Sequence, residues 1–278
     1  MDLTEITEGQ VIAIDGKTLR GSYDKATGKS AIHMVSAWAT ANRISLGQVV
    51  VDEKSNEITA IPKLLETLDI CGAMVTIDAM GCQTEIAAQI VEQGGDYCLA
   101  VKGNQPTLQA GIAEHFETEM ENDFAGAEAR VHTTEKCGHG REETRRYIVC
   151  PVPEQLPDRA RWKGLKAIGL AINTTYRDGK ITTEVRYYIL STYPSAKDFA
   201  AAVRGHWGIE NQLHWHLDVS LLEGLCRVRK RHAAANLSIL RRTALAMLLN
   251  ETSLDVGIKI KRLMAAWDTA YLEKVLFS

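Results

Sequence analysis

Three carboxylates in this 278-residue chain stand where they could do chemistry together. Asp15 and Asp78 each follow a short apolar run, Val-Ile-Ala-Ile before the first and Met-Val-Thr-Ile before the second. Glu210 lies one heptad from both Val203 and Leu217, so helical spacing predicts that it points toward the core with them. A buried carboxylate is costly unless a cation or hydrogen bonds compensate for its charge. On the helix alone, an ion pair with a nearby arginine or histidine is an equal alternative.

The set of three carboxylates suits divalent metal ions. Close carboxylates repel one another unless a positive charge lies among them. Two Mg²⁺ (or Mn²⁺) ions would supply that charge, because hard cations prefer oxygen ligands. Two such ions about 3.5–4 Å apart can activate a water or a 3′-hydroxyl for in-line phosphoryl transfer. A single aspartate after a strand is more often a turn or helix cap, so the prediction depends on the whole set.

The first half of the chain contains the elements that would position the two aspartates. Apolar runs predict strands at 11–16, 32–40, 44–53, 74–81 and 97–101. Asp15 is expected as the last strand residue of the first run, with Lys17, Arg20 and Gly21 in a polar turn. The short link 41–43 fits a hairpin, so the first three strands form an antiparallel meander. Helices are expected from Asn56, from Ile86 to a stop at Gly94-Gly95, and over 107–121.

The order of these elements predicts an α/β fold with a mixed sheet flanked by helices. Residues 126–193 read as a β-rich insertion, with one hairpin turning at 177–180 and another between Thr133 and Val149. Helices resume at Ser195, with two in the tail at 231–250 and 258–275. The expected organisation is a first part of the core (1–125), the insertion (126–193) and a helical part that carries Glu210 (194–278).

Composition indicates a globular protein outside membranes. The chain is 45% hydrophobic and 24% charged, with a net charge of −3. No apolar run is long enough for a membrane span, and Met1–Glu5 shows no secretory signal. The six cysteines lack paired short spacings, which indicates free thiols in a reducing compartment. A cytoplasmic location is therefore expected.

Basic residues offer candidate contacts to nucleic-acid phosphates despite the net negative charge. The candidates are Lys17, Arg20, Lys102, Asn104, Arg204, Arg227, Arg229, Lys230, Arg231, Arg241 and Arg242. The C-terminal group of arginines could equally form a solvated face. The turn Lys102-Gly103-Asn104-Gln105 could hold a phosphate or a base, or be a simple polar turn.

Histidine and tryptophan residues around Glu210 have competing interpretations. The spacing of His206, His214, His216 and Cys226 matches no structural zinc pattern, so zinc is not expected. Trp207 and Trp215 could stack on bases. A position in the core is the favoured interpretation for both tryptophans.

Four segments of the chain resemble the H-repeat-associated transposases, which are bacterial insertion-sequence transposases of the DDE type. These segments are Ile14–Lys17, Thr76–Gln83, Val101–Gln105 and Arg204–Glu210. The resemblance covers about residues 10–250. It implies an RNase H-like core and a metal-binding triad of Asp15, Asp78 and Glu210. It also implies cleavage and strand transfer at the ends of double-stranded DNA without a covalent protein–DNA intermediate, by a homodimer in a synaptic complex.

The sequence also departs from its relatives. They usually carry roughly a hundred further N-terminal residues, whereas this chain starts just before the first strand. The wider superfamily has a tyrosine–arginine–glutamate–lysine signature around the glutamate. Here Val203, His206 and Leu217 stand at the three other positions. Two alternatives to a transposase therefore stay open: a nuclease with the same triad but no strand transfer, and an inactive, truncated DNA-binding remnant.

Overall fold

The computed structural model describes residues 9–24, 28, 30–51, 55–125, 128–138 and 140–277. Its contacts group the chain into two units, which we call unit 1 (Met1–Asp69 with Gly205–Ser278) and unit 2 (Ile70–Arg204). Four features of the sequence predictions fall outside the described residues: the N-terminal start, the end of the strand at 44–53, the beginning of the insertion and His139. The three-part division by residue number stays a prediction.

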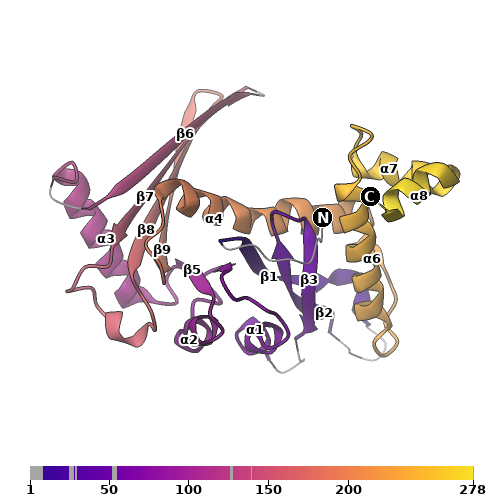
Figure 1. Cartoon of the computed structure of the whole chain (residues 1–278), viewed down its shortest axis with the longest axis horizontal. Helices are drawn as coiled ribbons and strands as arrows, with labels where there is room; N and C mark the ends of the chain where they lie inside the picture. The colour runs from indigo at the N-terminus through magenta and orange to yellow at the C-terminus, as the bar shows by residue number, and fades with distance from the viewer. Residues whose placement is uncertain are drawn as a thin grey trace. The chain divides into compact units, whose positions relative to one another are not determined.

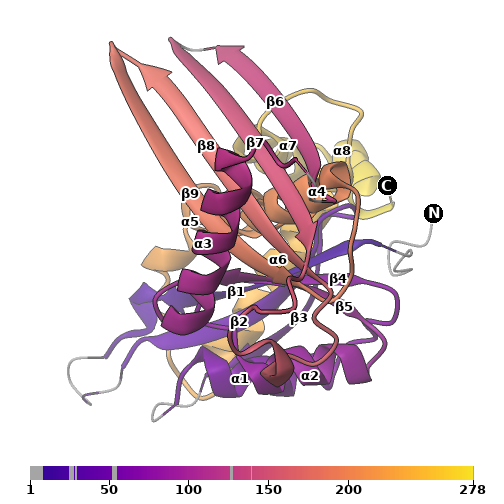
Figure 2. The ribbon, with the colours of Figure 1, turned by 90° about the vertical axis from the view of Figure 1, so that its left-hand side faces the viewer.

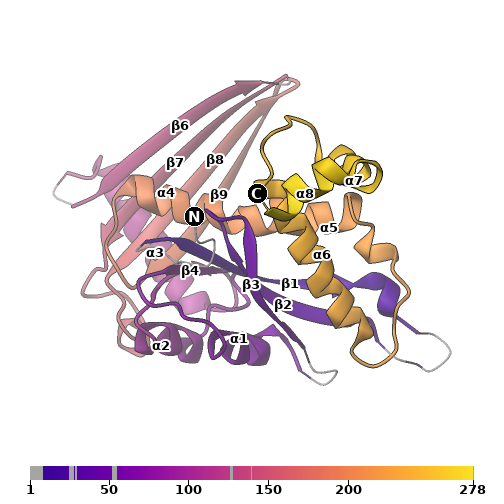
Figure 3. The same ribbon diagram turned by 45° about the vertical axis from the view of Figure 1, so that its right-hand side comes forward.

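Unit 1 contains the predicted antiparallel meander. Its strands are β1 (Val11–Leu19), β2 (Ile32–Ala39) and β3 (Ile44–Val50), with β2 between the other two (Figure 3). β1 is longer than expected, since it continues past Asp15 to Leu19 and ends at the 3₁₀ turn η1 (Arg20–Ser22). Leu19 explains the extension, because it packs with Met34 of β2 and buries apolar surface.

Side chains alternate between the two faces of β1 and β2, and both faces of the meander are buried there. Gly47 of β3 approaches Leu64 of α1 (Glu57–Leu65), the helix predicted from Asn56. On the other face, Trp38 packs with Ile209 and Leu213 and with α6 (Ala233–Asn250), which crosses the sheet in Figure 3. Asp15 and Lys17 therefore share a face of β1 with Ala13, which packs in the same cluster as Trp38.

Unit 2 contains parallel and antiparallel strands, as the alternation of strands and helices predicted. β4 (Met74–Ile77) runs parallel to β5 (Asp96–Val101), and the β-rich segment adds four antiparallel strands to β5. Both predicted hairpins are confirmed and extend side by side in Figure 2. They are formed by β6 (Arg130–Gly138), β7 (Arg141–Pro151), β8 (Ala167–Arg177) and β9 (Lys180–Leu190). Asp178 and Gly179 have φ of 51° and 76°, as a two-residue hairpin turn requires.

Helices cover the sheet of unit 2. α2 (Thr84–Glu92) packs on β5 and ends before Gly94, whose φ of 78° suits glycine. α3 (Pro106–Glu121) lies along the hairpins in Figure 2. Phe199 of α4 (Ala196–Gly208) inserts between Tyr147 and Tyr188, edge-on to both rings. Gly169 leaves the space for its ring, because a Cβ there would lie 2.5 Å from Phe199.

The tail of unit 1 differs from the prediction of one helix over 258–275. Figure 1 shows two helices, α7 (Ile258–Trp267) and α8 (Thr269–Phe277), with a break at Asp268. The Asp268 carboxylate accepts the backbone N–H groups of Ala270 and Tyr271, at 2.9 and 3.3 Å. A carboxylate that caps a new helix in this way ends the preceding one. None of the described helices has the length and apolar character to cross a membrane.

Polar contacts around the buried Glu251 connect α7 and α8 with the end of α6. They predict that the stability of the fold is sensitive to acid. Hydrogen bonds from Ser253 and from the Tyr271 hydroxyl lower the pKa of Glu251 to about 2. Because this pKa is depressed, the stabilisation is fully present above the ordinary glutamate pKa and is lost as pH falls through about 2. Glu251→Gln should therefore lower stability at pH 7 and flatten its acid limb between about pH 5 and pH 2. Urea midpoints measured across this pH range test the prediction, and an unchanged slope in the variant would contradict it.

Candidate active site

Asp15 lies in the middle of β1, directly opposite Ser36 of β2. Its Oδ2 is 3.4 Å from Nδ1 of His214, and both side chains are largely buried. Burial alone would raise the pKa of Asp15, but the hydrogen bond and charge of His214, together with the charge of His206, hold it below its ordinary value. The carboxylate is therefore kept ionised at neutral pH, which is the form that binds a cation.

Only glycine fits at position 16, next to Asp15, for a steric reason. Its position faces the other side of β1, where His33 Nε2 and Glu57 Oε1 form a contact of 2.6 Å. A Cβ on Gly16 would lie within 2.6 Å of both of these side chains. The Asp-Gly pair that was expected to end the strand thus lies within it, and position 16 has no room for a side chain.

Lys17 forms a second polar contact between β1 and the helix that follows Glu210. Its Nζ is 2.6 Å from Oδ2 of Asp218, a residue of α5 (Trp215–Val219). Asp15 and Lys17 of β1 thus contact His214 and Asp218, which lie one helical turn apart. Lys17 was expected in a polar turn as a phosphate contact. It is instead a buried strand residue, and a phosphate contact would require this ion pair to open.

The Lys17–Asp218 ion pair predicts that replacing Asp218 lowers stability more than replacing Lys17. The Lys17 side chain is 7% exposed and that of Asp218 is 43% exposed. Asp218→Asn leaves a buried ammonium without its counter-charge and should cost about 1–3 kcal/mol, whereas Lys17→Met leaves a carboxylate that water can reach and should cost less. Thermal unfolding of the two variants tests this order, and a larger loss for Lys17→Met would contradict it.

Glu210 is exposed, in contrast to the predicted inward direction shared with Val203 and Leu217. The heptad spacing between Glu210 and Leu217 does not hold, because a π-helical segment, η3 (Ile209–His214), lies between α4 and α5. A π turn holds an additional residue and therefore shifts the register of the apolar stripe. Ile209 and Leu213 take the inward positions, and the Glu210 carboxylate has no hydrogen bond or ion pair with any residue that the structure describes. Its oxygens are available to a ligand.

Both tryptophans near Glu210 lie outside the core. Trp207 is 36% exposed and Trp215 is 52% exposed, so the favoured core interpretation is wrong for both. Trp215 stacks edge-on against His216, with ring centroids 4.8 Å apart. The face of this helix that carries Glu210 is therefore partly aromatic.

Asp78 directly follows β4 in unit 2, as the sequence predicted. Its Oδ1 accepts the backbone N–H groups of Met80 and Gly81, at 3.0 and 3.3 Å. Within the described part of the chain, Oδ2 has no such partner. Burial, and then the charge of Asp78, raise the pKa of the Cys82 thiol to about 12, so this cysteine is neutral beside the carboxylate.

The turn after β5 contacts the Asp78 loop. Asn104 Nδ2 donates to the carbonyl of Ala79, and Gln105 Nε2 donates to the carbonyl of Cys82 at 3.0 Å. Lys102 is exposed beside them. The amide nitrogen of Asn104, predicted as a DNA contact, is thus engaged within the protein.

The three carboxylates suit a divalent metal by chemistry, because each offers hard oxygen ligands. Asp15 and Glu210 belong to unit 1 and Asp78 to unit 2. Across the ranges that the structure describes, no three His, Cys, Asp or Glu side chains form a group that could hold a metal ion. Metal binding by the triad and the absence of zinc both stay predictions.

Arg242 occupies an interior position, which differs from the exposed one that a phosphate contact requires. It is 2% exposed, and its guanidinium donates to the hydroxyls of Ser36 and Ser238, at 3.1 and 3.3 Å. The Ser238 hydroxyl in turn donates to Glu223 at 2.8 Å, and Glu223 is 1% exposed. Burial lowers the pKa of Arg242 to about 10, against the raising effect of Glu223. Arg242 is thus a structural charge of unit 1.

The other predicted phosphate contacts remain on the surface or partly so. Arg229 forms an ion pair with Asp24 at 3.1 Å, and Arg241 hydrogen-bonds the sulfur of Cys226. The exposed members are Arg20, Lys102, Arg204, Arg227, Lys230 and Arg231. These six keep the exposure that binding to a DNA backbone needs.

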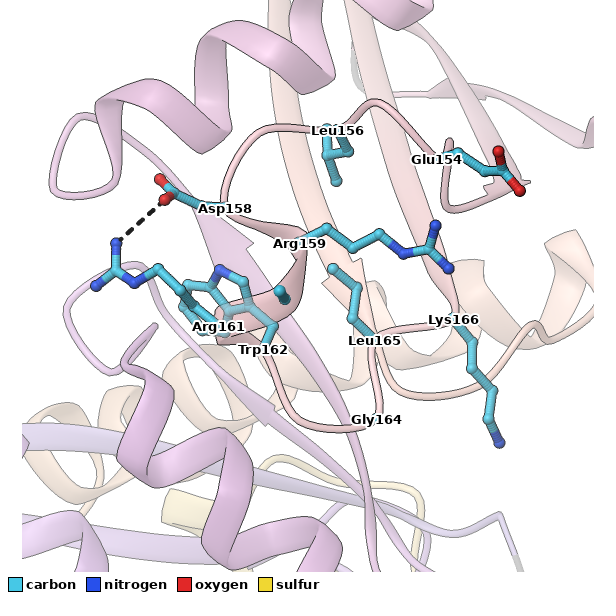
Figure 4. Close-up of a pocket in the computed structure, with 10 residues that line it drawn as sticks. Glu154, Leu156, Asp158, Arg159, Arg161, Trp162, Gly164, Leu165 and Lys166 are labelled. Carbon is cyan, nitrogen blue, oxygen red and sulfur yellow. Dashed lines mark ion pairs between the residues drawn. The ribbon is translucent and has the colours of Figure 1, made fainter.

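A surface depression of about 680 Å³ is lined by residues within 154–166, in the segment that connects β7 to β8 (Figure 4). Trp162 and Leu165 are buried beside it, and Asp158 and Arg161 form an ion pair of 3.5 Å there. No predicted site residue lines it. The depression is therefore separate from the candidate carboxylates.

Sequence reasoning missed the partners of the carboxylates. It did not assign His214 to Asp15 or Asp218 to Lys17, although both lie at four-residue steps from Glu210 on a helix. That spacing was the available signal. Asn104 and Gln105 were noted only as part of a polar turn.

Comparison with known proteins identifies the family. Residues 6–249 match the family model described as a transposase DDE domain. The chain is 46% identical to "Putative transposase YncI" of Escherichia coli O157:H7, over 99% of the chain and 70% of that protein. It is also 46% identical to "H repeat-associated putative transposase YhhI" of E. coli K12, over 96% of the chain and 71% of that protein. The chain thus belongs to the family of transposases with a DDE domain.

Proposed function

We propose that this chain cleaves the ends of an insertion-sequence-like DNA element in a metal-dependent reaction and joins those ends to target DNA. The observation that carries the proposal is that all three acidic positions are present in a member of the DDE family, with Glu210 and Asp78 Oδ2 open to a ligand. The proposed core is RNase H-like, and the proposed working form is a homodimer on two DNA ends in the bacterial cytoplasm.

Asp15, Asp78 and Glu210 would hold two Mg²⁺ or Mn²⁺ ions, which when bound activate a water or 3′-hydroxyl and stabilise the leaving oxygen. The chain's own residues prepare this site. His214 and His206 keep Asp15 ionised, and the N–H groups of Met80 and Gly81 orient the carboxylate of Asp78. No side chain need act as the nucleophile. Exposed residues such as Arg227, Lys230 and Arg231 would contact DNA phosphates, which positions the duplex without reading its sequence.

The experiment that tests this proposal is a strand-transfer assay. Labelled duplex with the element's own terminal repeats is incubated with the protein, Mg²⁺ or Mn²⁺, and an unlabelled target plasmid. Label joined covalently to the plasmid is the expected result. Cleavage without joining would contradict strand transfer and favour the nuclease. Binding without cleavage would contradict catalysis and favour the inactive remnant.

A further inference from the structure

The turn Lys102–Gln105 holds the loop that carries Asp78. From the two contacts of this turn we infer that Asn104 and Gln105 are positioning residues for Asp78, and not contacts to DNA. The inference rests on the proposed role of Asp78 as a metal ligand. It concerns unit 2 alone, where both segments follow neighbouring parallel strands.

The loop from Asp78 to Gln83 lacks a sheet partner, so its shape depends on its own hydrogen bonds. The backbone N–H groups of Cys82 and Gln83 donate to the carbonyls of Ala79 and Gly81, at 3.2 and 2.9 Å. Asp78 Oδ1 accepts two backbone N–H groups inside the loop, and Gln83 Nε2 donates back to the Met80 carbonyl at 3.1 Å. These local bonds shape the loop. They do not fix it relative to the sheet.

Asn104 and Gln105 supply that attachment. Their amide groups donate to the carbonyls of Ala79 and Cys82, one on each side of the Met80-Gly81 segment. The two bonds therefore hold both ends of the segment whose N–H groups bind Asp78. The main chain of Gln105 is itself fixed, because its N–H donates to the Lys102 carbonyl at 2.9 Å and its carbonyl accepts the Gln109 N–H of α3.

The hydrogen bonds from Asn104 and Gln105 to the Asp78 loop resemble those by which residues outside the ligand set of a metal hold a ligand in place. Residues that orient a first ligand through hydrogen bonds typically change metal affinity by about 10–100-fold when they are removed. Since β4 and β5 are adjacent parallel strands, the turn after one is well placed to hold the loop after the other. Lys102, whose side chain has no such bond in the described structure, and Gly103, which has no side chain, would not share this role.

Asn104→Ala and Gln105→Ala test the inference, with Asn122→Ala as the matched control. Asn122 Nδ2 also donates to a backbone carbonyl, that of Thr118 at 2.9 Å, but at the end of α3. The first readout is hydrogen exchange of the Met80 and Gly81 amides, which needs neither metal nor DNA. We expect exchange at these amides to accelerate about tenfold in each test variant, as the loss of one hydrogen bond allows, and to be unchanged in Asn122→Ala.

The second readout is the Mn²⁺ concentration that gives half-maximal DNA cleavage. It should rise by about 10–100-fold in Asn104→Ala, with recovery of the rate at saturating Mn²⁺. Unchanged amide exchange, or a lower rate that excess Mn²⁺ does not restore, would overturn the inference. If the wild type cleaves no DNA, the proposed function fails, whereas amide exchange still decides whether the two side chains hold the loop.

Discussion

Asp15→Asn, Asp78→Asn and Glu210→Gln are each expected to lower the rate of DNA cleavage by more than about a thousandfold, or ~4 kcal/mol in activation free energy. Each change keeps the size of the side chain and removes the charge that a hard cation needs. In Asp78→Asn, the remaining Oδ1 can still accept the N–H groups of Met80 and Gly81, so the loop keeps its shape. A loss of activity in Asp78→Asn would therefore result from the missing charge of Asp78.

The measurement is the initial rate of cleavage with saturating metal. Asp255→Asn is the matched control, because Asp255 is an exposed carboxylate of unit 1. Unchanged thermal unfolding would show that each variant is folded. Because groups that act as a unit are not additive, the triple variant should be little worse than the single ones. A single variant that keeps more than about a tenth of wild-type activity would remove that residue from the triad.

Glu223→Gln is expected to lower the free energy of unfolding by about 3–5 kcal/mol, since removing one member of a buried charge pair leaves the other uncompensated. Arg242, with a pKa of about 10, keeps its proton at pH 7 and would remain charged in the interior. Arg242→Met should cost less, because the carboxyl group of Glu223 can take up a proton. The double variant Glu223→Leu with Arg242→Met should recover most of the loss.

Urea unfolding of Glu223→Leu, Arg242→Met and the double variant closes a double-mutant cycle and measures this coupling. The same cycle is repeated with Ser238→Ala, because the Ser238 hydroxyl lies between the two charges. Ser238→Ala should therefore reduce the coupling between Glu223 and Arg242. Additive losses in the double variant would show that the two buried groups do not compensate for one another.

Regular periodicity made much of the fold predictable. The meander, the alternation of strands and helices in unit 2, and both hairpins follow from apolar runs and turn residues. The end of β1 was missed because the apolar run stops at Asp15-Gly16, which was predicted to end the strand before a polar turn. The glycine is required there by the His33–Glu57 pair, which comes from elsewhere in the chain.

The direction of Glu210 was not predictable, because the argument assumed regular α-helical spacing. The π turn at Ile209–His214 breaks the heptad spacing between Glu210 and Leu217, and no residue type announces it. The Lys17–Asp218 contact joins residues 201 positions apart, so the helical spacing could place Asp218 near Glu210 but could not identify Lys17 as its partner. Burial of Arg242 was hidden for a related reason, since its counter-charge lies outside its own helix.

The most direct test of the central claim is the metal dependence of DNA cleavage. Chelator-treated protein is incubated with end-labelled duplex that carries the element's own terminal repeats, and Mg²⁺ or Mn²⁺ is then added. We predict no cleavage before the ion is added, cleavage afterwards, and no protein attached covalently to the DNA. Cleavage that continues in chelator, a covalent protein–DNA product, or no cleavage with either ion would contradict a metal-dependent reaction at Asp15, Asp78 and Glu210.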